Sequence, residues 1–223
     1  MTRIFSIFFI AATGLLLISS VHVLATPPQT NDPFYSSVPS AYMEDPRRTE
    51  WQKADQVIEH LLIKQGDTIA DIGAGTGFFS TRFAKKIGKT GLVFASDVDE
   101  TMVRFIEKRA QKEGLANIRS IHGKTDDPLI PRASADIIFI CDTYLFIDNR
   151  VNYLTRLKES IKNSGRLAII SFNASADIPG APPQKRMIPK SVVIREALAA
   201  GYVLEADFYF LPYQDFLLFK KLQ

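Results

Sequence analysis

Cysteine and histidine are scarce in this chain of 223 residues, which has one cysteine, Cys141, and three histidines. A single cysteine excludes an intramolecular disulfide and any zinc site built from several cysteines. The acidic residues on the expected loops lack histidine partners, a pattern that gives no support to a transition-metal site. We therefore expect no metal centre.

A strong charge of one sign is also missing. The chain has 27 basic and 24 acidic residues, for a formal net charge of +3. It contains no dense basic stripe interleaved with aromatic residues, which is the pattern typical of nucleic-acid-binding surfaces. We expect no nucleic-acid partner, and the sequence does not indicate an oligomeric state.

The N-terminus differs in composition from the rest of the chain. Arg3 precedes an apolar run from Ile4 to Ile18, and Val23-Leu-Ala25 provides a small-residue cleavage pattern. This order is typical of a secretory signal peptide over residues 1–25, and an uncleaved membrane anchor is the alternative. Since Arg3 is the only basic residue before the run, the rest of the chain is expected to be exported or periplasmic.

The remainder divides into a tether and one domain. Residues 26–40 are rich in Pro, Ser, Thr and Asn and predict a flexible tether. Residues 41–223 have a length suited to a single α/β domain. No membrane contact is expected beyond the possible N-terminal anchor.

Strands and helices alternate along this domain, after a first helix that ends near Ile63. Apolar runs such as Ile137–Ile140 are typical of parallel strands covered on both faces. The last two strands are separated only by Pro212-Tyr213, which leaves no room for a helical crossover and predicts an antiparallel hairpin. The expected strands are 68–72, 92–96, 118–122, 136–141, 166–172, 202–211 and 214–221, and the later helices are 78–87, 100–113, 151–162 and 190–200. The pattern predicts an α/β, Rossmann-like doubly wound sheet, mostly parallel with an antiparallel C-terminal hairpin strand.

A glycine-rich loop, Asp71–Gly77, joins the first of these strands to the next helix. Gly73, Gly75 and Gly77, with Ala74 between the first two, allow a sharp turn and a close approach of the backbone to a ligand. The N-terminal amides of the following helix would point at that ligand. We expect these loop residues to bind a nucleoside-bearing cofactor.

Two residues beside the glycines select the ligand class. The dinucleotide pattern G-x-G-x-x-G would place its third glycine where Phe78 stands. Asp71 is an acid that would be unfavourable beside a pyrophosphate but favourable beside an ammonium group. S-adenosylmethionine (SAM) carries such an ammonium, so Asp71 is predicted to be its partner, directly or through water. SAM is therefore favoured over a nicotinamide or flavin cofactor.

The end of the second strand supplies the next cofactor contacts. Asp97 is placed to accept hydrogen bonds from the ribose hydroxyls, as carboxylates do in dinucleotide folds. It could instead cap the following helix, although Asp99 is better placed for that role. Val98 is expected to flank the adenine or to pack in the core.

The loop after the third strand contains two competing acids. Asp126 could accept a hydrogen bond from the adenine amino group, and Asp127 could do the same. An Asx turn before Pro128 is the simpler alternative for either acid.

Several ordered motifs together resemble the class I SAM-dependent methyltransferases. The similarity runs from about Val57 to Lys221, and its motifs are Asp71–Ser80, Ala95–Met102, Gly123–Pro131 and Ser164–Ala168. The stretch Met43–Lys53 resembles the leader of a bacterial subgroup of predicted methyltransferases that commonly carry an export signal. The resemblance implies a seven-stranded sheet with its last strand inserted antiparallel, and SAM lying across the carboxyl ends of the strands.

Residues after the fourth strand should lie near the reacting end of the cofactor, because ligands of open α/β sheets bind at the switch point of strand order. Asp142 and Tyr144 are therefore the candidate catalytic residues. Asp142 could act as a general base or serve as a structural carboxylate. The subgroup often has a histidine just after this tyrosine, where this chain has Leu145 and Phe146. Cys141 is expected to be a buried strand residue rather than a nucleophile.

The resemblance implies transfer of a methyl group by in-line displacement to a small-molecule or lipid-like acceptor, a reaction that depends mainly on placing donor and acceptor. Two segments are expected to shape the acceptor pocket: Tyr42–Lys53 as a lid and the loop Asn173–Pro189, whose Lys185 and Arg186 could meet an anionic acceptor. A SAM- or S-adenosylhomocysteine-binding module without turnover, and less favoured a nicotinamide-dependent enzyme, are the alternatives.

Overall fold

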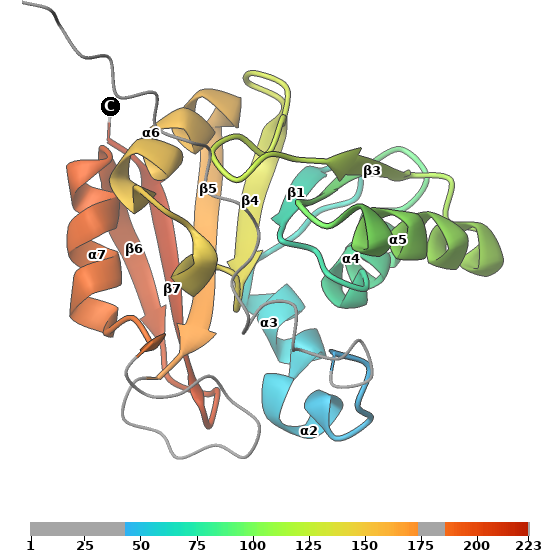
Figure 1. Cartoon of the computed structure of the whole chain (residues 1–223), viewed down its shortest axis with the longest axis horizontal. Helices are drawn as coiled ribbons and strands as arrows, with labels where there is room; N and C mark the ends of the chain where they lie inside the picture. Colours follow the sequence, from blue (N-terminus) through green and yellow to red (C-terminus); the bar gives the residue numbers. More distant parts are fainter. Residues whose placement is uncertain (1–42, 174–185, 223) are drawn as a thin grey trace, which may run out of the picture.

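The computed structural model describes residues 43–173 and 186–222. They form a seven-stranded sheet in the order β3-β2-β1-β4-β5-β7-β6 with helices on both faces (Figure 1). The strands are β1 (Thr68–Ile72), β2 (Leu92–Asp97), β3 (Ile118–His122), β4 (Ala135–Cys141), β5 (Ile161–Phe172), β6 (Tyr202–Phe208) and β7 (Gln214–Lys221). The helices are α2 (Arg48–Gln52), α3 (Ala54–His60), α4 (Phe78–Ile87), α5 (Glu100–Glu113), η1 (Tyr144–Phe146, 3-10), α6 (Arg150–Ser160) and α7 (Lys190–Ala199). The signal or anchor, the tether and positions 174–185 of the predicted acceptor loop lie outside the described residues.

The strand pairing confirms the predicted fold class. β1 pairs in parallel with β2 and β4, and β4 pairs in parallel with β5. β7 runs antiparallel to both of its neighbours, so it enters the sheet between β5 and β6. This is the Rossmann-like doubly wound sheet with an antiparallel hairpin at one edge that the sequence predicts.

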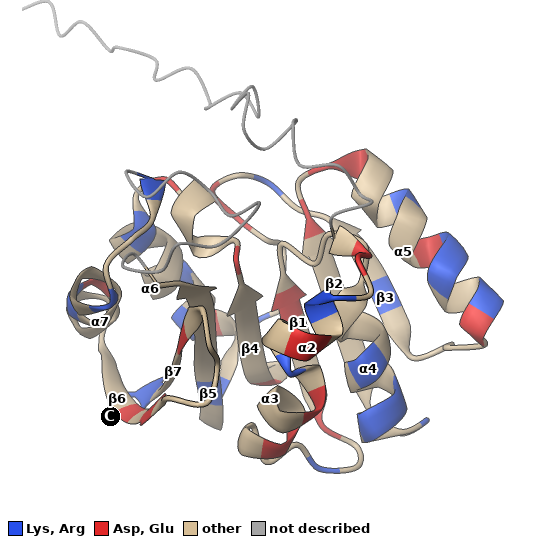
Figure 2. Ribbon diagram, turned by 90° about the horizontal axis from the view of Figure 1, so that it is seen from below, with Lys and Arg blue, Asp and Glu red and all other residues tan. Residues whose placement is uncertain are grey.

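Each face of the sheet has its own hydrophobic core. On one face, α3, α4 and α5 cover a core that includes Phe83, Phe139 and Phe216. On the other, η1, α6 and α7 cover a core that includes Tyr144 and Phe219, and Figure 2 shows α6 and α7 opposite α3 and α4. The central strands, such as β1, β2 and β4, are buried on both sides, which explains their continuous apolar runs.

Two predicted strand boundaries are wrong by several residues. The strand expected over 202–211 ends at Phe208. The helix expected over 151–162 ends at Ser160, and the strand expected from residue 166 begins at Ile161. Ile161 is fully buried and pairs with Ala135, before a register shift in the β4–β5 ladder. A strand that begins with such an irregularity carries no alternating pattern over its first residues, so periodicity alone does not reveal it.

The carboxyl ends of β1 and β4 meet beside the glycine loop. Figure 2 shows acidic residues at both strand ends. The hydroxyl of Thr143, just after β4, donates to the carbonyl of Gly73 at 3.2 Å and to that of Cys141 at 3.1 Å. The two strand ends that were expected to be neighbours are thus in direct contact.

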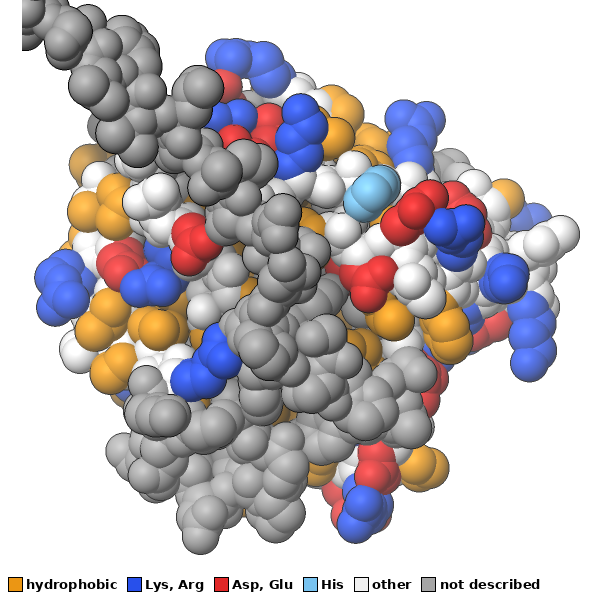
Figure 3. Space-filling model, viewed as in Figure 1, with side chains coloured by type: hydrophobic (Ala, Val, Ile, Leu, Met, Phe, Trp, Pro, Cys, Tyr) orange, Lys and Arg blue, Asp and Glu red, His pale blue; other side chains and the backbone are white. Residues whose placement is uncertain are grey.

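The surface carries charges of both signs close together. On the face seen in Figure 3, basic and acidic side chains alternate around apolar ones. Over residues 43–173 and 186–222, no helix has both the length and the apolar character needed to cross a bilayer.

Candidate active site

The glycine loop is held in a conformation that a side chain would disturb. Gly73, Gly75 and Gly77 have φ angles of +68°, +55° and +77°, in the left-handed region. A Cβ on Gly73 would lie 2.2 Å from Oγ1 of Thr143, and one on Gly75 would lie 3.1 Å from Sδ of Met43. At these glycines the backbone therefore passes closely between the end of β4 and the segment Met43–Lys53, which we call the leader segment. This loop fits a cofactor held through backbone contacts.

Asp97 ties this loop to the end of β2. Its side chain is buried, with Oδ2 accepting from the Gly75 amide at 2.8 Å and Oδ1 accepting from the Asp99 amide at 2.9 Å. Asp99 is the residue that caps the N-terminus of α5, because its carboxylate accepts a hydrogen bond from the Thr101 amide at 2.7 Å. The choice between these two acids is therefore resolved as predicted: Asp99 caps α5, and Asp97 lies at the glycine loop.

Val98 lies between these acids, and its carbonyl is 3.1 Å from Nε2 of His122 at the end of β3. His122 thus packs across the β2 and β3 ends rather than facing β4. The other histidine of the described domain, His60, stacks on Phe210 with ring centroids 4.5 Å apart. His60 is thus partly buried in an aromatic stack, whereas His122 is exposed and contacts the β2 end through a hydrogen bond.

Asp71, at the end of β1, is buried, and its Oδ2 accepts from the Ser80 hydroxyl at 2.5 Å. Burial raises the pKa of Asp71 from 3.8 to about 7, while the Ser80 hydrogen bond and the charge of Arg48 act in the opposite direction. Nearby Asp97 raises it further. At neutral pH this carboxyl group is close to half ionised, and a cation bound beside it would favour the ionised form. That property suits a partner for the ammonium of SAM.

The two acids after β3 have different surroundings. Asp127 forms the Asx turn, since its Oδ1 accepts from the Leu129 amide at 2.8 Å and its Oδ2 pairs with Arg156 at 2.8 Å. Asp126 is exposed beside it. Because Asp127 is engaged in this way, Asp126 is the acid left for the predicted adenine contact.

Asp142 follows β4 in a left-handed conformation, with φ +57°. Its Oδ1 and Oδ2 accept from Nε2 of Gln214 at 2.8 and 2.9 Å. Burial raises the pKa of Asp142 from 3.8 to about 6, against the lowering effects of Arg48 and Gln214. Burial and the Asp142 charge also raise the pKa of the Cys141 thiol, so that thiol stays protonated. Of these two groups, the Asp142 carboxyl is the one that ionises near neutral pH.

Tyr144 lies in a different environment from the one expected of a residue near the reacting methyl. Its side chain is fully buried in the core under α6 and α7, and its hydroxyl donates to Oε2 of Glu196 at 2.7 Å. Arg150 pairs with the same carboxylate at 2.8 Å. The cause is η1, a turn that the sequence pattern did not predict and that directs the ring into the sheet face. Tyr144 therefore packs and anchors α7, and Asp142 stays as the candidate catalytic residue.

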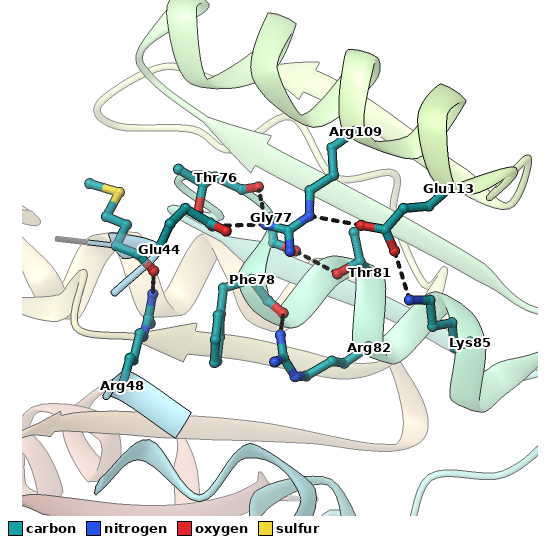
Figure 4. A network of polar contacts seen from close by, with 11 residues as sticks. Glu44, Arg48, Thr76, Gly77, Phe78, Thr81, Arg82, Lys85, Arg109 and Glu113 are labelled. Carbon is teal, nitrogen blue, oxygen red and sulfur yellow. Dashed lines mark hydrogen bonds and ion pairs between the residues drawn. The ribbon is translucent and has the colours of Figure 1, made fainter. Parts of the chain in front are cut away.

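The leader segment before α3 packs directly on the glycine loop. Oε1 of Glu44 accepts from the Thr76 hydroxyl and from Nη1 of Arg109 at 2.8 Å (Figure 4). Arg109, on α5, also donates to the Thr76 carbonyl at 3.2 Å. At its other end, Trp51 lies against Phe172 of β5, with ring centroids 5.8 Å apart. The leader thus reaches from the glycine loop to the end of β5.

Arg48 is the cation of the leader that acts on both buried acids. Its charge lowers the pKa of Asp71 and of Asp142. Its guanidinium lies 4.2 Å from the centre of the Phe78 ring, and that of Arg82 lies 3.8 Å from it, so the ring is placed between two cations (Figure 4). The sequence did not predict this role of Arg48, because Arg48 is one of several charged residues in a polar stretch.

Other residues of the site were also missed. Gln52, Thr143 and Gln214 each contact the loop, Asp142 or one another, and none has a signal of its own in the sequence. Only the leader motif Met43–Lys53 pointed toward one of them, Gln52. Among residues 43–173 and 186–222, no group of three or more His, Cys, Asp or Glu side chains is arranged to hold a metal ion.

Comparison with known proteins bears on this geometry. The chain is 28% identical over 124 residues to a ubiquinone/menaquinone biosynthesis C-methyltransferase of Hydrogenovibrio crunogenus, covering 55% of this chain and 48% of the relative. It is 29% identical over 131 residues to an aklanonic acid methyltransferase of a Streptomyces species, covering 57% of this chain and 59% of the relative. The match thus spans about half the length of these curated relatives.

Solved structures and a family profile extend the comparison. The fold superposes on a SAM-dependent methyltransferase from Aquifex aeolicus with a TM-score of 0.77 and 26% identity, covering 81% of this chain and 95% of the other. Residues 63–199, more than half of the chain, match the methyltransferase domain family. The chain belongs to this family and has the fold of the class I SAM-dependent methyltransferases.

Proposed function

We propose that this methyltransferase transfers the methyl group of SAM to a small-molecule acceptor that lies against Asp142. The observation that carries the proposal is the Thr143–Gly73 hydrogen bond, which fixes the β4 end beside the glycine loop. The names of the curated relatives support a small acceptor, since they refer to quinone biosynthesis and to aklanonic acid. Donor and acceptor would then meet between the ends of β1 and β4.

The residues at the ends of β1, β2 and β3 would hold the cofactor. Asp97 fixes Gly75 and would accept from the ribose hydroxyls, and ionised Asp71 would pair with the ammonium group. Asp126 would accept from the adenine amino group, beside Val98. Bound SAM supplies a methyl group on a positively charged sulfur.

Asp142 would act on the acceptor. With a pKa of about 6 it is ionised at neutral pH, so its carboxylate can orient an acceptor hydroxyl or amine and take up its proton during transfer. In-line displacement depends chiefly on alignment, and the rigid β4 end provides it. The leader would close one side of the acceptor site, with Trp51 against Phe172.

Calorimetry and a turnover assay together test this proposal. We expect SAM and S-adenosylhomocysteine to bind, and S-adenosylhomocysteine to be released when phenolic and quinone-like acceptors are supplied. Asp142→Asn should lower turnover at least about tenfold while SAM affinity stays within about threefold. Binding without release over a broad acceptor panel would support a non-catalytic SAM-binding module, a reading that the absence of the subgroup histidine after Tyr144 also favours.

We also propose that the domain acts outside the cytoplasm. The support is the apolar run from Ile4 to Ile18 with its following cleavage pattern. Fractionation of a C-terminally tagged chain should find it outside the cytoplasm, and N-terminal sequencing should show whether residues 1–25 have been removed. A cytoplasmic protein with an intact N-terminus would contradict this proposal.

A further inference from the structure

Two glutamines are buried between the leader and the β4 end. Gln52, the last residue of α2, is fully buried, and Gln214, the first residue of β7, is 4% exposed. Burying an amide is unfavourable unless its donors and acceptors are satisfied. Both side chains meet that condition by bonding to each other, with Nε2 of Gln52 lying 2.8 Å from Oε1 of Gln214.

The direction of these hydrogen bonds is determined by the group at each end. An ionised carboxylate only accepts, so Gln214 must turn its NH2 group toward Asp142, at 2.8 and 2.9 Å. Its oxygen then faces Gln52, which must donate. The oxygen of Gln52 in turn lies 3.3 Å from Nε of Arg48, a group that only donates. The chain of donors runs one way, from a cation to an anion.

We propose that Gln52 and Gln214 are positioning residues for Asp142, forming a one-way chain of side-chain amides from the Arg48 guanidinium to the Asp142 carboxylate. The consequence is that Asp142 is correctly held only when α2 is docked. The role rests on the proposed function in one respect, that Asp142 faces the acceptor. The arrangement of the chain itself does not depend on the reaction.

Backbone geometry shows why Asp142 needs this support. A non-glycine residue at φ +57° lies in the left-handed region, and the cost of that conformation must be offset by its surroundings. Two charge-assisted hydrogen bonds to Gln214 offset that cost and fix the direction of the carboxylate. Without them, a partly buried carboxylate would lack its amide donor and could adopt other rotamers.

The two glutamines have separable effects. Losing the Gln214 amide removes the direct donor to Asp142. Losing the donor of Gln52 leaves the oxygen of Gln214 unsatisfied, so the Gln214 side chain is held from one side only and its amide donates to Asp142 in a less fixed geometry. The other groups that act on the Asp142 charge are Arg48 from α2 and the Cys141 thiol from β4. Neither replaces an amide donor.

The test measures the ionisation of Asp142 in the full chain by carbon-detected NMR, with Asp142→Asn used to assign its carboxyl signal. Gln214→Met should raise the pKa of Asp142 by about one unit, a tenfold change in the ionisation equilibrium, and Gln52→Met should raise it by less. Gln65→Met is the matched control, because Gln65 is exposed and bonds only to the Lys86 carbonyl. It should leave the pKa of Asp142 unchanged.

A further variant removes the donor of Gln52 while keeping its shape. Gln52→Glu keeps the bond to Arg48 but removes the donor to Gln214, and its negative charge acts on Asp142 in the same direction, so it should raise the pKa of Asp142 more than Gln52→Met. If the pKa stays within about 0.3 unit of the wild-type value in folded Gln214→Met and Gln52→Glu, the positioning role is wrong. Should Gln214→Met fail to fold, the Gln52 pair decides the question.

SAM affinity distinguishes this inference from the proposed function. We expect the Gln52 and Gln214 variants to bind SAM within about threefold of wild type, because neither side chain contacts the glycine loop. If wild-type protein binds no SAM, the proposed function fails whatever the NMR result. If SAM binds and the pKa of Asp142 does not move, only the positioning role fails.

Discussion

The two halves of the site are built from contacts of very different range. On the donor side, Asp97 reaches Gly75 across 22 positions and Asp71 reaches Ser80 across 9. On the acceptor side, Gln214 reaches Asp142 across 72 positions and Gln52 reaches Gln214 across 162. The donor side is thus formed by neighbouring strand ends and their loops. The acceptor side forms only when the leader, β4 and β7 come together.

This difference separates binding from transfer. The predicted donor side takes its Asp97–Gly75 and Asp71–Ser80 contacts from β1, β2 and the segments that follow them, so these contacts need no residue from the C-terminal half of the chain. The acceptor side depends on side chains from three distant segments, so it can change without loss of cofactor binding. Mutations on the two sides should therefore give different phenotypes.

The largest effect is expected on the donor side, from Asp97→Ala. The change leaves the partly buried amides of Gly75 and Asp99 without their carboxylate acceptor and removes the predicted ribose contact. SAM affinity measured by calorimetry should fall more than about a hundredfold, because bonds to charged groups contribute about 1.5–3 kcal/mol each. An unchanged affinity would show that Asp97 does not contact the ribose.

Asp99→Ala is the matched control for that change. It removes only the α5 cap and should lower the free energy of unfolding by about 1 kcal/mol. SAM affinity should stay within about threefold of wild type.

The next largest effect is expected where the two sides touch, from Gly73→Ala. The added Cβ would lie 2.2 Å from the Thr143 side chain, at a φ of +68°. We expect thermal denaturation to show a loss of about 2–4 kcal/mol, from the left-handed backbone and the clash together. Gly114→Ala has a similar φ of +66° and open space around it, so it should cost only about 1 kcal/mol. Equal losses in the two variants would show that the Thr143 contact adjusts freely.

A pH titration should give a smaller, graded effect. Since the pKa of Asp71 is about 7 in the free protein, the carboxyl gains a proton as the pH falls, and its attraction for the SAM ammonium is lost. SAM affinity should fall by up to about tenfold per pH unit between about pH 7 and 5.5. Asp71→Asn should bind more weakly and remove most of this dependence.

Stability should respond to the same group in the opposite direction. The folded pKa of Asp71 lies above its ordinary value of 3.8, so the folded state binds the extra proton. Its contribution to the free energy of unfolding should therefore increase as the pH falls from about 7 toward 4. Comparing urea denaturation of wild type and Asp71→Asn isolates that contribution.

The smallest effect is expected at the surface end of the leader, from Glu44→Gln. Glu44 is 35% exposed, and its ion pair with Arg109 is partly screened by solvent (Figure 4). The loss of stability should be about 0.5–1 kcal/mol, with a parallel rise in proteolysis between Met43 and Lys53. If proteolysis is unchanged, the contacts at the Gln52 end suffice to hold the leader.

The sequence predicted the elements whose ends carry local signals. Helix α5 was placed to the residue because Asp99 caps its start and Gly114 ends it. The start of β5 was missed because an irregular pairing with β4 has no periodic pattern. Boundaries set by local capping residues could thus be predicted from the sequence. Boundaries set by pairing with a distant strand could not.

The same distinction applies to the site. The sequence indicated Asp71 and Asp97 because each sits at a strand end within a spaced motif. Tyr144 was misplaced because η1 turns its ring into the core. Gln52 and Gln214 could not be paired from the sequence, since an amide separated from its partner by most of the chain leaves no local pattern.

The insertion of β7 between β5 and β6 determines when each half of the site can form during synthesis. Once β1 and β2 have emerged, Asp97 and Gly75 can form their hydrogen bond, whereas Gly73 gains its Thr143 contact only after β4 has been made. Asp142 emerges later but has no amide donor until Gln214 has been made and the final strand has entered between two strands already present. Pairings over long sequence separation form slowly, and domains made on the ribosome assemble in chain order. On the proposed function, the half of the site that would hold the cofactor thus forms first and the half that would direct transfer forms last.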